Sequence, residues 1–409
     1  MAKLSLEDLE FKGKRVLVRV DFNVPLDKKT GEISDDLRIR ASLPTIKYII
    51  EHGGKAILAS HLGRPDGQVV EKLRMNKVAQ RLEAIIGKKV KKLNDCIGPE
   101  VEKEVKVMKE GEIVLLENVR FHPEEEENNP DFARALASLA DLYVSDAFGT
   151  VHRSHASTAG VAKFIPAASG FLLKKEIDAF DKILHSPDRP FVVILGGAKV
   201  SDKIGVIENL MEKCDTILIG GAMAFTFEKS RGLEIGSSLV EEDKLELART
   251  ILEKAEKKKV KIITPLDHVV ATEVSPTAER KVVSRDGIPP GWKGLDIGPK
   301  TVAEFKKIMS KARTILWNGP LGVFEVEPFS QGTMAIAKAM AECKAMTVVG
   351  GGDSVAAVTK AGVFNKISHV STGGGASLEL LEGKDLPGIS VLMQHQQLGV
   401  ASPKGREKK

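Results

Sequence analysis

The sequence predicts an α/β protein with two doubly wound, mainly parallel sheets of the Rossmann type. Its 409 residues suit two domains better than one. Short β-branched apolar runs recur along both halves, and amphipathic helical patterns separate them. Near-continuous apolar runs are typical of strands buried on both faces, and alternation with helices is typical of parallel sheets.

Ten candidate strands can be identified in order along the chain, and ten fit two sheets better than one. The first half contains the runs 15–20 (RVLVRV), 55–60 (KAILAS), 112–117 (EIVLLE) and 142–147 (LYVSDA). The second half contains 191–195 (FVVIL), 216–220 (TILIG), 261–265 (KIITP), 314–318 (TILWN), 346–350 (MTVVG) and 367–371 (ISHVS).

Helical patterns lie between these runs, at 38–53, 76–89 and 241–259. Gly87 follows the second pattern and is expected to be its C-cap. The segment 168–190 predicts one helix joining two domains, able to hinge at its ends. We therefore expect domains at 1–170 and 189–384, with a linker helix at 171–188. The acidic run EEEE at 124–127 is expected to be a solvated loop.

Composition excludes several classes of protein. A net charge of +5, from 61 basic and 56 acidic residues, is too small to indicate nucleic-acid binding, but it suits anionic small molecules if the cations cluster. The three cysteines, Cys96, Cys214 and Cys343, have no metal-binding spacing and are expected to be reduced, buried thiols. Without a signal peptide or an apolar run of membrane-spanning length, the chain is expected to be cytoplasmic, with no membrane partner.

Basic and polar residues follow the strands of the first half. They are Asp21, Asn23, His61, Arg64, Arg120, His152, Arg153 and His155, with Arg38 at an expected helix start. Ligands of open α/β sheets bind at the carboxyl ends of the strands. Because arginine binds carboxylate and phosphate through two hydrogen bonds, this edge suits a small, multiply charged anion. Any single arginine is explained as well by a surface ion pair, but their repetition at strand ends favours an anion site.

Glycines follow the strands of the second half. The segments are 196–199, 220–223, 292–299, 317–325, 350–354 and 371–377. Glycine lets backbone N–H groups approach a ligand, and a following helix adds its positive N-terminus, so a nucleotide site is expected here. Each Gly-Gly pair is also ordinary turn chemistry. Asp353 follows three glycines, where a carboxylate suits Mg²⁺ beside phosphates, although an N-cap is the alternative.

The stretch LGGAKVSDKIG at 195–205 brings glycines and lysines together without matching the Walker pattern. We expect a strand end, a glycine turn and the first turn of a helix. Lys199 and Lys203 are four residues apart, so on one helix they would share a face. Two adjacent lysines repel unless an anion lies near them, and nucleotide phosphates would be that anion.

Nine segments, taken in order, resemble phosphoglycerate kinase across roughly residues 10 to 390. They are RVDFNVP, SHLGRP, ENVRF, DAFGTVHRSHAS, GGAKVSDKI, GGAMAFTF, WNGPLGVFE, GGGDS and STGGGASLELLEGK. The resemblance implies a monomer of two domains, with 3-phosphoglycerate or 1,3-bisphosphoglycerate bound by the first and Mg²⁺ with ADP or ATP by the second. It also implies that the chain end, about 385–409, returns to the first domain. The final basic residues of this tail are expected to be disordered.

The resemblance also implies roles for individual residues. Arg38 and Lys199 would be catalytic. The triose-phosphate site would comprise Asp21, Phe22, Asn23, Arg38, His61, Leu62, Gly63, Arg64, Arg120 and Arg153. The nucleotide site would comprise Gly197, Ala198, Lys203, Gly221, Gly294, Leu295, Asn318, Glu325, Gly351, Gly352, Asp353 and Ser354, with Asp353 also holding the metal. Ser354 stands where many relatives have threonine, and Ala222 replaces a common glycine.

The implied reaction moves an acyl phosphate between 1,3-bisphosphoglycerate and ADP. Because each nucleophile is already an anion, no general base is needed, and closure of the two domains would align the groups and exclude water. A dinucleotide-dependent dehydrogenase is the nearest alternative, but no Gly-x-Gly-x-x-Gly follows a strand. A non-enzymatic nucleotide- or RNA-binding protein is the other, and the aromatic content of 5% argues against a base-stacking surface.

Overall fold

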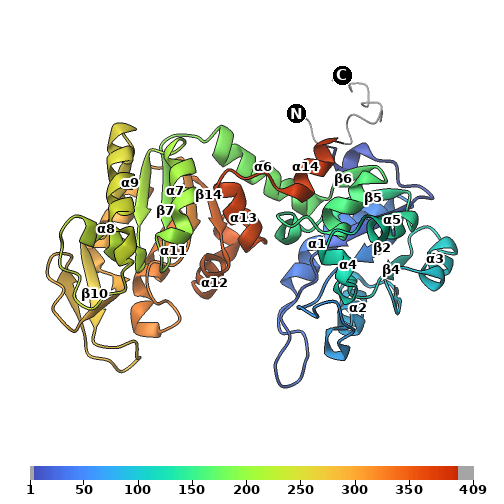
Figure 1. Ribbon diagram of the computed structural model, residues 1–409, viewed down its shortest axis with the longest axis horizontal. Coiled ribbons are helices and arrows are strands. Elements are labelled where there is room, and N and C mark those ends of the chain that lie inside the picture. The colour runs from blue at the N-terminus through green and yellow to red at the C-terminus, as the bar shows by residue number, and fades with distance from the viewer. Residues whose placement is uncertain (1–3, 395–409) are drawn as a thin grey trace. The chain divides into compact units, whose positions relative to one another are not determined.

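The computed structural model describes residues 4–394, and its contacts divide the chain into two units (Figure 1). Unit 1 extends to Ile177 and takes up the chain again from Asp385, and unit 2 is Asp178–Lys384. The division falls inside helix α6 (Phe171–His185), so the single helix predicted for this segment is confirmed. Its role as a hinge stays a prediction.

Unit 1 is built on a six-stranded parallel sheet with strand order β3-β4-β2-β1-β5-β6. Its strands are β1 (Arg15–Val20), β2 (Lys55–Ala59), β3 (Val90–Lys92), β4 (Ile113–Leu115), β5 (Leu142–Asp146) and β6 (Ala167–Ser169). The middle strands are buried almost throughout, as their apolar runs predict. The strand order reverses between β1 and β5, which places the expected ligand crevice at their carboxyl ends.

Helices cover the sheet of unit 1 (Figure 1). They are α1 (Leu37–Glu51), α2 (Asn76–Ile86), α3 (Pro99–Lys106), α4 (Pro123–Glu126) and α5 (Pro130–Ser138), with short turns η1 (Leu6–Asp8), η2 (Glu71–Leu73), η3 (Val119–Phe121), η4 (Phe148–Thr150), η5 (Ala156–Gly160) and η6 (Val161–Lys163). Gly87 ends α2 with a φ of 70°, a left-handed conformation that glycine adopts without steric cost. This confirms the predicted C-cap.

The chain returns to unit 1 at α14 (Pro387–Gln394), which lies beside β6 in Figure 1. The backbone N–H of Gly388 donates to the carbonyl oxygen of Val151 at 2.9 Å. A β-carbon on Gly388 would lie 3.0 Å from Val151, so the two backbones approach closely here. Residues 395–409, which include the tail expected to be disordered, lie outside the described residues.

Unit 2 contains a second six-stranded parallel sheet, with order β15-β14-β13-β7-β8-β9, and a three-stranded antiparallel sheet, β11-β10-β12. The strands are β7 (Phe191–Leu195), β8 (Thr216–Ile219), β9 (Lys261–Ile263), β10 (Asp267–Ala271), β11 (Arg280–Ser284), β12 (Lys293–Ile297), β13 (Thr314–Asn318), β14 (Met346–Gly350) and β15 (His369–Val370). The order reverses between β7 and β13, so the crevice of this sheet is expected where Leu195 and Asn318 end their strands.

The helices of unit 2 alternate with the parallel strands. They are α7 (Ile204–Met211), α8 (Met223–Ser230), α9 (Leu245–Lys257), α10 (Pro299–Met309), α11 (Gln331–Glu342), α12 (Gly352–Lys360) and α13 (Gly374–Leu381), with short turns η7 (Ser201–Lys203), η8 (Glu242–Lys244), η9 (Glu327–Phe329) and η10 (Phe364–Lys366). Within residues 4–394, none of the helices combines the length and apolar character needed to cross a bilayer.

The two doubly wound α/β sheets are confirmed, and each of the ten predicted runs contains a strand. Five strands were not predicted from the sequence: β3, β6 and the antiparallel β10, β11 and β12. The interpretation of 124–127 as a solvated loop is wrong, because most of the run forms α4 and Glu125 is 0% exposed.

Candidate active site

Four arginines surround a buried histidine at the carboxyl ends of the unit 1 strands. His61 follows β2 and is 5% exposed. Burial holds its pKa well below the ordinary value, and the charges of the neighbouring arginines lower it further. These arginines are Arg19, Arg120, Arg38 and Arg153. We call these four arginines and His61 the basic cluster.

Arg19 was not among the residues predicted for the site. It lies in β1, is 1% exposed, and its Nη2 is 3.2 Å from Nδ1 of His61. Because a guanidinium only donates hydrogen bonds, Nδ1 must accept, which leaves neutral His61 with its proton on Nε2. An arginine inside an otherwise apolar strand was the available signal, since a buried charge needs a partner.

A buried carboxylate balances Arg19 through a serine. Nε of Arg19 donates to Oγ of Ser157 at 2.8 Å, and Ser157 in turn donates from its Oγ and backbone N–H to Glu125 at 2.6 and 2.8 Å. Burial raises the pKa of Glu125, while the charge of Arg19 opposes that rise. Glu125, from the acidic run at 124–127, is therefore the carboxylate that stabilises Arg19 of the basic cluster through Ser157.

Asp21 and Asn23 form the opening of this site after β1. Nη1 of Arg38 donates to Oδ2 of Asp21 at 2.5 Å, while the Arg38 side chain remains 38% exposed. Oδ1 of Asn23 accepts from the backbone N–H of Gly63 at 2.8 Å. The side chains of Phe22 and Leu62 belong to the core, at 0% and 2% exposed. Only the backbone of these two residues is therefore available to a ligand.

The remaining arginines differ in how they are held. Nη1 of Arg120 donates to the Gly63 carbonyl oxygen at 3.1 Å, and its Nε lies 3.2 Å from Glu126. Arg153 contacts His152 but no carboxylate within residues 4–394. Arg64 is exposed and has neither a hydrogen bond nor an ion pair in that range. The structure thus brings Arg38, His61, Arg120 and Arg153 together and does not join Arg64 to them.

His155 extends the site toward η5. It is half-buried, and burial together with the nearby Arg120 and Arg19 lowers its pKa to about 4. Its Nδ1 lies 3.9 Å from Glu125. His155 is therefore neutral near pH 7 and adds no positive charge to the basic cluster.

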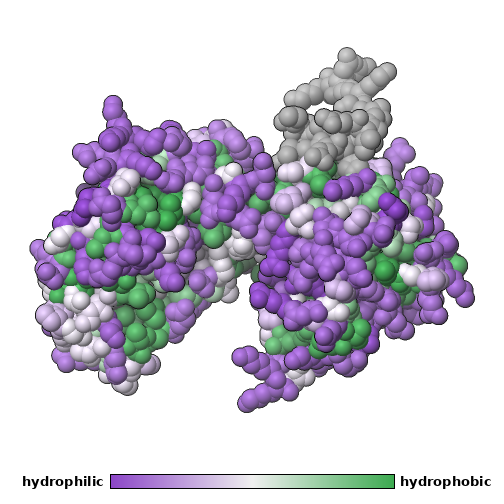
Figure 2. Space-filling model, viewed as in Figure 1, coloured by the Kyte–Doolittle hydropathy of each residue, from purple (hydrophilic) through white to green (hydrophobic). Residues whose placement is uncertain are grey.

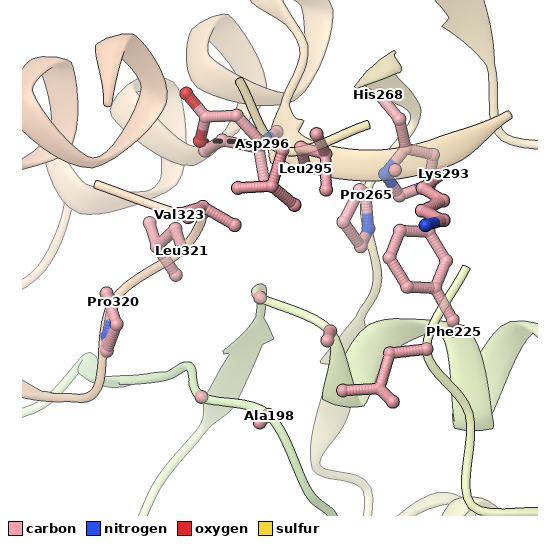
Figure 3. A pocket seen from close by; sticks show the side chains of 18 of the residues that line it. Ala198, Phe225, Pro265, His268, Lys293, Leu295, Asp296, Pro320, Leu321 and Val323 are labelled. Carbon is pink, nitrogen blue, oxygen red and sulfur yellow. Dashed lines mark hydrogen bonds between the residues drawn. The ribbon is translucent and has the colours of Figure 1, made fainter. Parts of the chain in front are cut away.

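Unit 2 carries a cavity of about 400 Å³ (Figure 3). Its walls come from the loops after β7, β8 and β13 and from the antiparallel sheet. Of the predicted nucleotide residues, the lining includes Gly197, Ala198, Gly221, Gly294, Leu295, Glu325 and Asp353. Leu239 and Val274 also line the cavity, although their side chains are 58% and 52% exposed. Figure 2 shows apolar and neutral residues on the surface of unit 2 around β10.

One wall of the cavity is an aromatic contact that requires glycine. A β-carbon on Gly294 would lie 2.1 Å from Cζ of Phe225, so any other residue would force the Phe225 ring to move. Phe225 packs beside His268, with ring centroids 4.8 Å apart, and Nε2 of His268 is 3.1 Å from both oxygens of buried Glu228. His268 and Phe225 both line the cavity (Figure 3). Such a flat, apolar slot suits a planar base.

Asp296 lines the cavity and accepts hydrogen bonds from two different segments of the backbone. It is 3% exposed, and its two oxygens accept from the backbone N–H groups of Ile297 at 2.9 Å and Gly332 at 2.7 Å. Burial raises the pKa of Asp296 to about 7, although these hydrogen bonds oppose the shift. A β-carbon on Gly322 would lie 2.3 Å from Oδ1 of Asp296, so the backbone of Gly322 packs directly against this carboxylate. Asp296 lies in the predicted glycine segment 292–299, but it was not predicted as a site residue because this segment was not recognised as the strand β12.

Polar groups and two helix starts gather beside the cavity. Nζ of Lys203 donates to Oδ1 of Asn318, whose Nδ2 donates to the Gly350 carbonyl oxygen at 2.8 Å. Oγ of Ser354 accepts from the backbone N–H of Gly319 at 2.6 Å. These residues, with Gly351 and Gly352, are not part of the cavity lining. They form the carboxyl edge of the sheet next to it.

The N-termini of α12 and α13 are adjacent, since a β-carbon on Gly374 would lie 3.5 Å from the backbone nitrogen of Gly352. Their backbone N–H groups and dipoles favour an anion. Asp353 stands in the first turn of α12, exposed and lining the cavity, and makes no hydrogen bond within residues 4–394. Burial lowers the pKa of Lys203, and the charge of Asp353 is one of those that oppose the shift. Asp353 is therefore close enough to influence Lys203.

The two lysines of the opening motif do not share a helix. Lys199 lies in the bend after β7, before η7 begins at Ser201, and only Lys203 is in a helical turn. Lys199 is exposed and without a hydrogen bond or ion pair in the described chain, whereas Lys203 is largely buried and paired with Asn318. The prediction of a shared helical face is wrong because the glycine turn extends through Val200, so that Lys199 precedes the first helical turn.

The sequence profile of the family "Phosphoglycerate kinase" matches residues 6–384. The phosphoglycerate kinase of Moorella thermoacetica is 58% identical over 394 residues, covering 96% of this chain and 100% of that protein. The chloroplastic phosphoglycerate kinase of Volvox carteri is 57% identical, covering 95% and 86%.

A solved structure is similar along nearly the whole chain. It is the phosphoglycerate kinase of Coxiella burnetii, with a TM-score of 0.89 and 43% identity, covering 96% of this chain and 99% of that one. The two-sheet fold of this chain is therefore that of a phosphoglycerate kinase. This chain belongs to the phosphoglycerate kinase family.

Proposed function

We propose that the basic cluster binds 3-phosphoglycerate or 1,3-bisphosphoglycerate and that the unit 2 cavity binds ADP or ATP with Mg²⁺. As a member of its family, the chain is a phosphotransferase whose acceptor is a carboxyl group. The observation that carries the assignment is the convergence of four arginines on neutral His61. Arg153 meets no carboxylate within residues 4–394, so its charge is available to a ligand.

The triose phosphate carries both a phosphate and a carboxylate or acyl phosphate, so it needs several donors. In this proposal Arg120, Arg153 and Nε2 of His61 donate to one end, while Arg38, Asp21 and Asn23 face the other. Asp21 positions Arg38 through their 2.5 Å hydrogen bond. Arg64 reaches the ligand from its exposed position. Charge-assisted hydrogen bonds from arginine are about twice as strong as neutral ones, which supports this choice of site for a small anion.

In this proposal the base of the nucleotide is held by packing in the cavity, and its phosphates are held by hydrogen-bond donors beside the cavity. The base lies in the slot formed by Phe225, Gly294 and Leu295, and the ribose meets Glu325. The phosphates extend toward Lys203, the Gly351–Gly352 turn and the starts of α12 and α13. Asp353 fits a metal that arrives with the nucleotide, because Mg²⁺ commonly takes one carboxylate and completes its shell with phosphates and water. When bound, it would neutralise phosphate charge.

Phosphoryl transfer then depends on alignment and positive charge rather than on a base. Arg38 and Lys199 stabilise the charge on the equatorial oxygens, with help from the helix N-termini. Lys199 suits this role because it has no partner in the described chain. The predicted closure about residues 171–188 would bring the ligands into line, and small-angle scattering tests it: superimposable profiles for free and doubly liganded protein would contradict closure.

The decisive measurement is a coupled assay for ATP formation from 1,3-bisphosphoglycerate and ADP, with Arg153→Ala as the variant. The KM for the triose phosphate should rise by at least about tenfold, since a charge-assisted hydrogen bond contributes about 1.5–3 kcal/mol, while the KM for ADP stays unchanged. Arg134→Ala, which removes an exposed arginine paired with Asp131, is the matched control. If the triose-phosphate KM were unchanged, the basic cluster would not be the triose-phosphate site.

We further propose that the protein is a cytoplasmic monomer without nucleic-acid or membrane partners. Sedimentation tests its oligomeric state.

A further inference from the structure

A second group of potential ligands lies in unit 1, at the loop after β3 and the end of η3. Its members are Asp95, Cys96 and His122, and one ligand atom from each lies within 4.8 Å of the other two. The site residues assigned above do not include them. The group brings together a carboxylate, a thiol and an imidazole from segments 26 residues apart in the sequence.

Each of the three side chains is held in place by its surroundings. Nε2 of His122 is 2.7 Å from Oδ1 of Asp95, and the same oxygen accepts from the backbone N–H of Cys96 at 2.7 Å. The His122 ring packs beside Phe132, with centroids 5.2 Å apart. Cys96 is 0% exposed, His122 is 28% exposed and Asp95 is 52% exposed. A cation from solvent therefore meets the carboxylate and imidazole first and the thiol last.

The electrostatic surroundings favour a cation. The charges of Asp95 and Glu125 act on the Cys96 thiol and raise its pKa, after burial, which has the largest effect. The charge of Glu124 adds to the effect of the Asp95 hydrogen bond in raising the pKa of His122. Asp95 and Glu124 thus act on the imidazole, and Asp95 and Glu125 on the thiol, although Glu125 is also paired with Arg19 through Ser157. A divalent cation held by the three side chains would be attracted by the carboxylate of Asp95.

We propose that Asp95, Cys96 and His122 bind a zinc ion. Thiolate and imidazole ligands select zinc over Mg²⁺ and Ca²⁺, which prefer oxygen. The site is thus distinct in chemistry from the Mg²⁺ position proposed at Asp353. Three protein ligands leave the fourth position of a tetrahedral zinc ion for water.

The geometry needs only small adjustments. In a tetrahedral site with Zn–S of about 2.3 Å and Zn–N of about 2.0 Å, ligand atoms lie roughly 3.3–3.6 Å apart. The Nε2–Oδ1 distance of 2.7 Å must open, and the distances to Sγ, within 4.8 Å, must shorten by up to about 1.5 Å. As the S–Zn bond forms, the thiol proton leaves to solvent, and any proton on Nε2 of His122 leaves with it. Binding therefore releases protons and tightens as pH rises.

The site would also fix the segment that carries Arg120. His122 directly follows η3 (Val119–Phe121), and the backbone N–H of His122 donates to the Val119 carbonyl oxygen at 3.3 Å. A ligand bond at His122 would tie this turn to the Asp95 loop. The inference about metal binding does not depend on the function proposed for Arg120.

Cobalt(II), which substitutes for zinc and absorbs visible light, tests the proposal on the full-length reduced protein. We expect one equivalent of Co²⁺ to produce a thiolate-to-metal charge-transfer band, and zinc to displace it. Excess Mg²⁺ should leave the band unchanged. A band that fails to form, while circular dichroism shows folded protein, would overturn the proposal.

Variants assign the ligands. Cys96→Ser should abolish the charge-transfer band, and His122→Asn or Asp95→Asn should weaken Zn²⁺ binding at least about tenfold. Cys214→Ser is the matched control, since it removes another buried thiol and should keep the band. Because replacing a buried residue such as Cys96 also perturbs packing, Asp95→Asn at an exposed position provides the second test. A band that survives Cys96→Ser, or Zn²⁺ affinity unchanged in both His122→Asn and Asp95→Asn, would place the metal elsewhere and refute the assignment.

Discussion

The basic cluster of unit 1 and the cavity of unit 2 lie at the same place in their folds, the carboxyl edge where the strand order reverses, yet they are built differently. The basic cluster consists of charged side chains fixed by a buried network of Arg19, Ser157 and Glu125. The cavity consists of glycine turns with aromatic and aliphatic walls, and two helix N-termini lie beside it. A small anion offers little shape, so its site needs charge, whereas a nucleotide offers a planar base, so its site can use packing.

The buried network in unit 1 provides the largest expected effect. Arg19→Leu should lower the free energy of unfolding by about 3–5 kcal/mol, because it leaves Glu125 buried without its compensating charge. Chemical denaturation measures this. Arg15→Leu, on the same strand but in a partly exposed pair with Asp141, should cost no more than about 1 kcal/mol. Equal costs for the two variants would show that the network does not hold the basic cluster.

Lys199 and Lys203 test whether unit 2 also uses charge. Lys199→Ala should lower kcat by about 10²–10³ and leave the Kd of Mg-ADP nearly unchanged, because its contact forms mainly in the transition state. Steady-state kinetics and calorimetry measure the two quantities. Lys254→Ala, at an exposed pair with Glu208, is the control. An equal loss in kcat and in ADP binding would assign Lys199 to ground-state binding instead.

The two units also differ in how pH acts on them. Burial raises the pKa of Asp296 to about 7, above its ordinary value of about 3.9. The folded state therefore keeps a proton that the unfolded chain has lost, so this stabilisation is complete below about pH 4 and is lost as pH rises to about 7. Asp296→Asn should flatten that decline, by up to about 1.4 kcal/mol per pH unit.

Denaturation at several pH values measures the slope, with the exposed Asp286→Asn as control. In unit 1 the buried Asp146, with a pKa of about 7, acts in the same direction, whereas His155, with a pKa lowered to about 4, acts in the opposite one. His155→Asn should therefore steepen the decline between about pH 4 and pH 6.5. If Asp296→Asn left the slope unchanged, the carboxyl would already be ionised in the folded protein.

The smallest effect concerns a single hydrogen bond at the edge of the unit 2 sheet. Ser354→Ala should lower the free energy of unfolding by about 0.5–1.5 kcal/mol, because the partly buried N–H of Gly319 loses its acceptor. Ser354→Thr keeps the hydroxyl and should cost less. Thermal unfolding ranks the variants, and a threonine variant weaker than the alanine one would show that space, not the hydrogen bond, is limiting.

Much of the fold could be predicted because buried parallel strands leave a simple pattern. The strands 15–20, 191–195, 314–318 and 346–350 begin and end where the apolar runs do. The antiparallel strand β11 could not be predicted this way, since most of its residues are exposed. Its neighbours β10 and β12, which were also not predicted, supply His268, Lys293 and Asp296 to the cavity. The sequence thus indicated the residues proposed to face the nucleotide phosphates better than the cavity wall proposed to hold the base.

Predictions for individual residues depended on local geometry. Residues directly after a strand, such as His61 and Arg120, could be placed because parallel strands end at one edge. The relation between Lys199 and Lys203 could not, since four-residue spacing has meaning only within a continuous helix. Asp95 and His122 meet only because two loops fold together, and a separation of 27 residues has no metal-binding pattern.

The return of the chain at α14 has a consequence for biosynthesis. Unit 1 contains most of the first 177 residues but also takes up the chain from Asp385, whereas unit 2 is one continuous segment, Asp178–Lys384. During translation, every residue of unit 2 has been added before Pro387–Gln394 exists to pack against β6. The domain made first is therefore completed last. A ribosome that stops before Asp385 releases a chain with all of unit 2 but an unfinished unit 1.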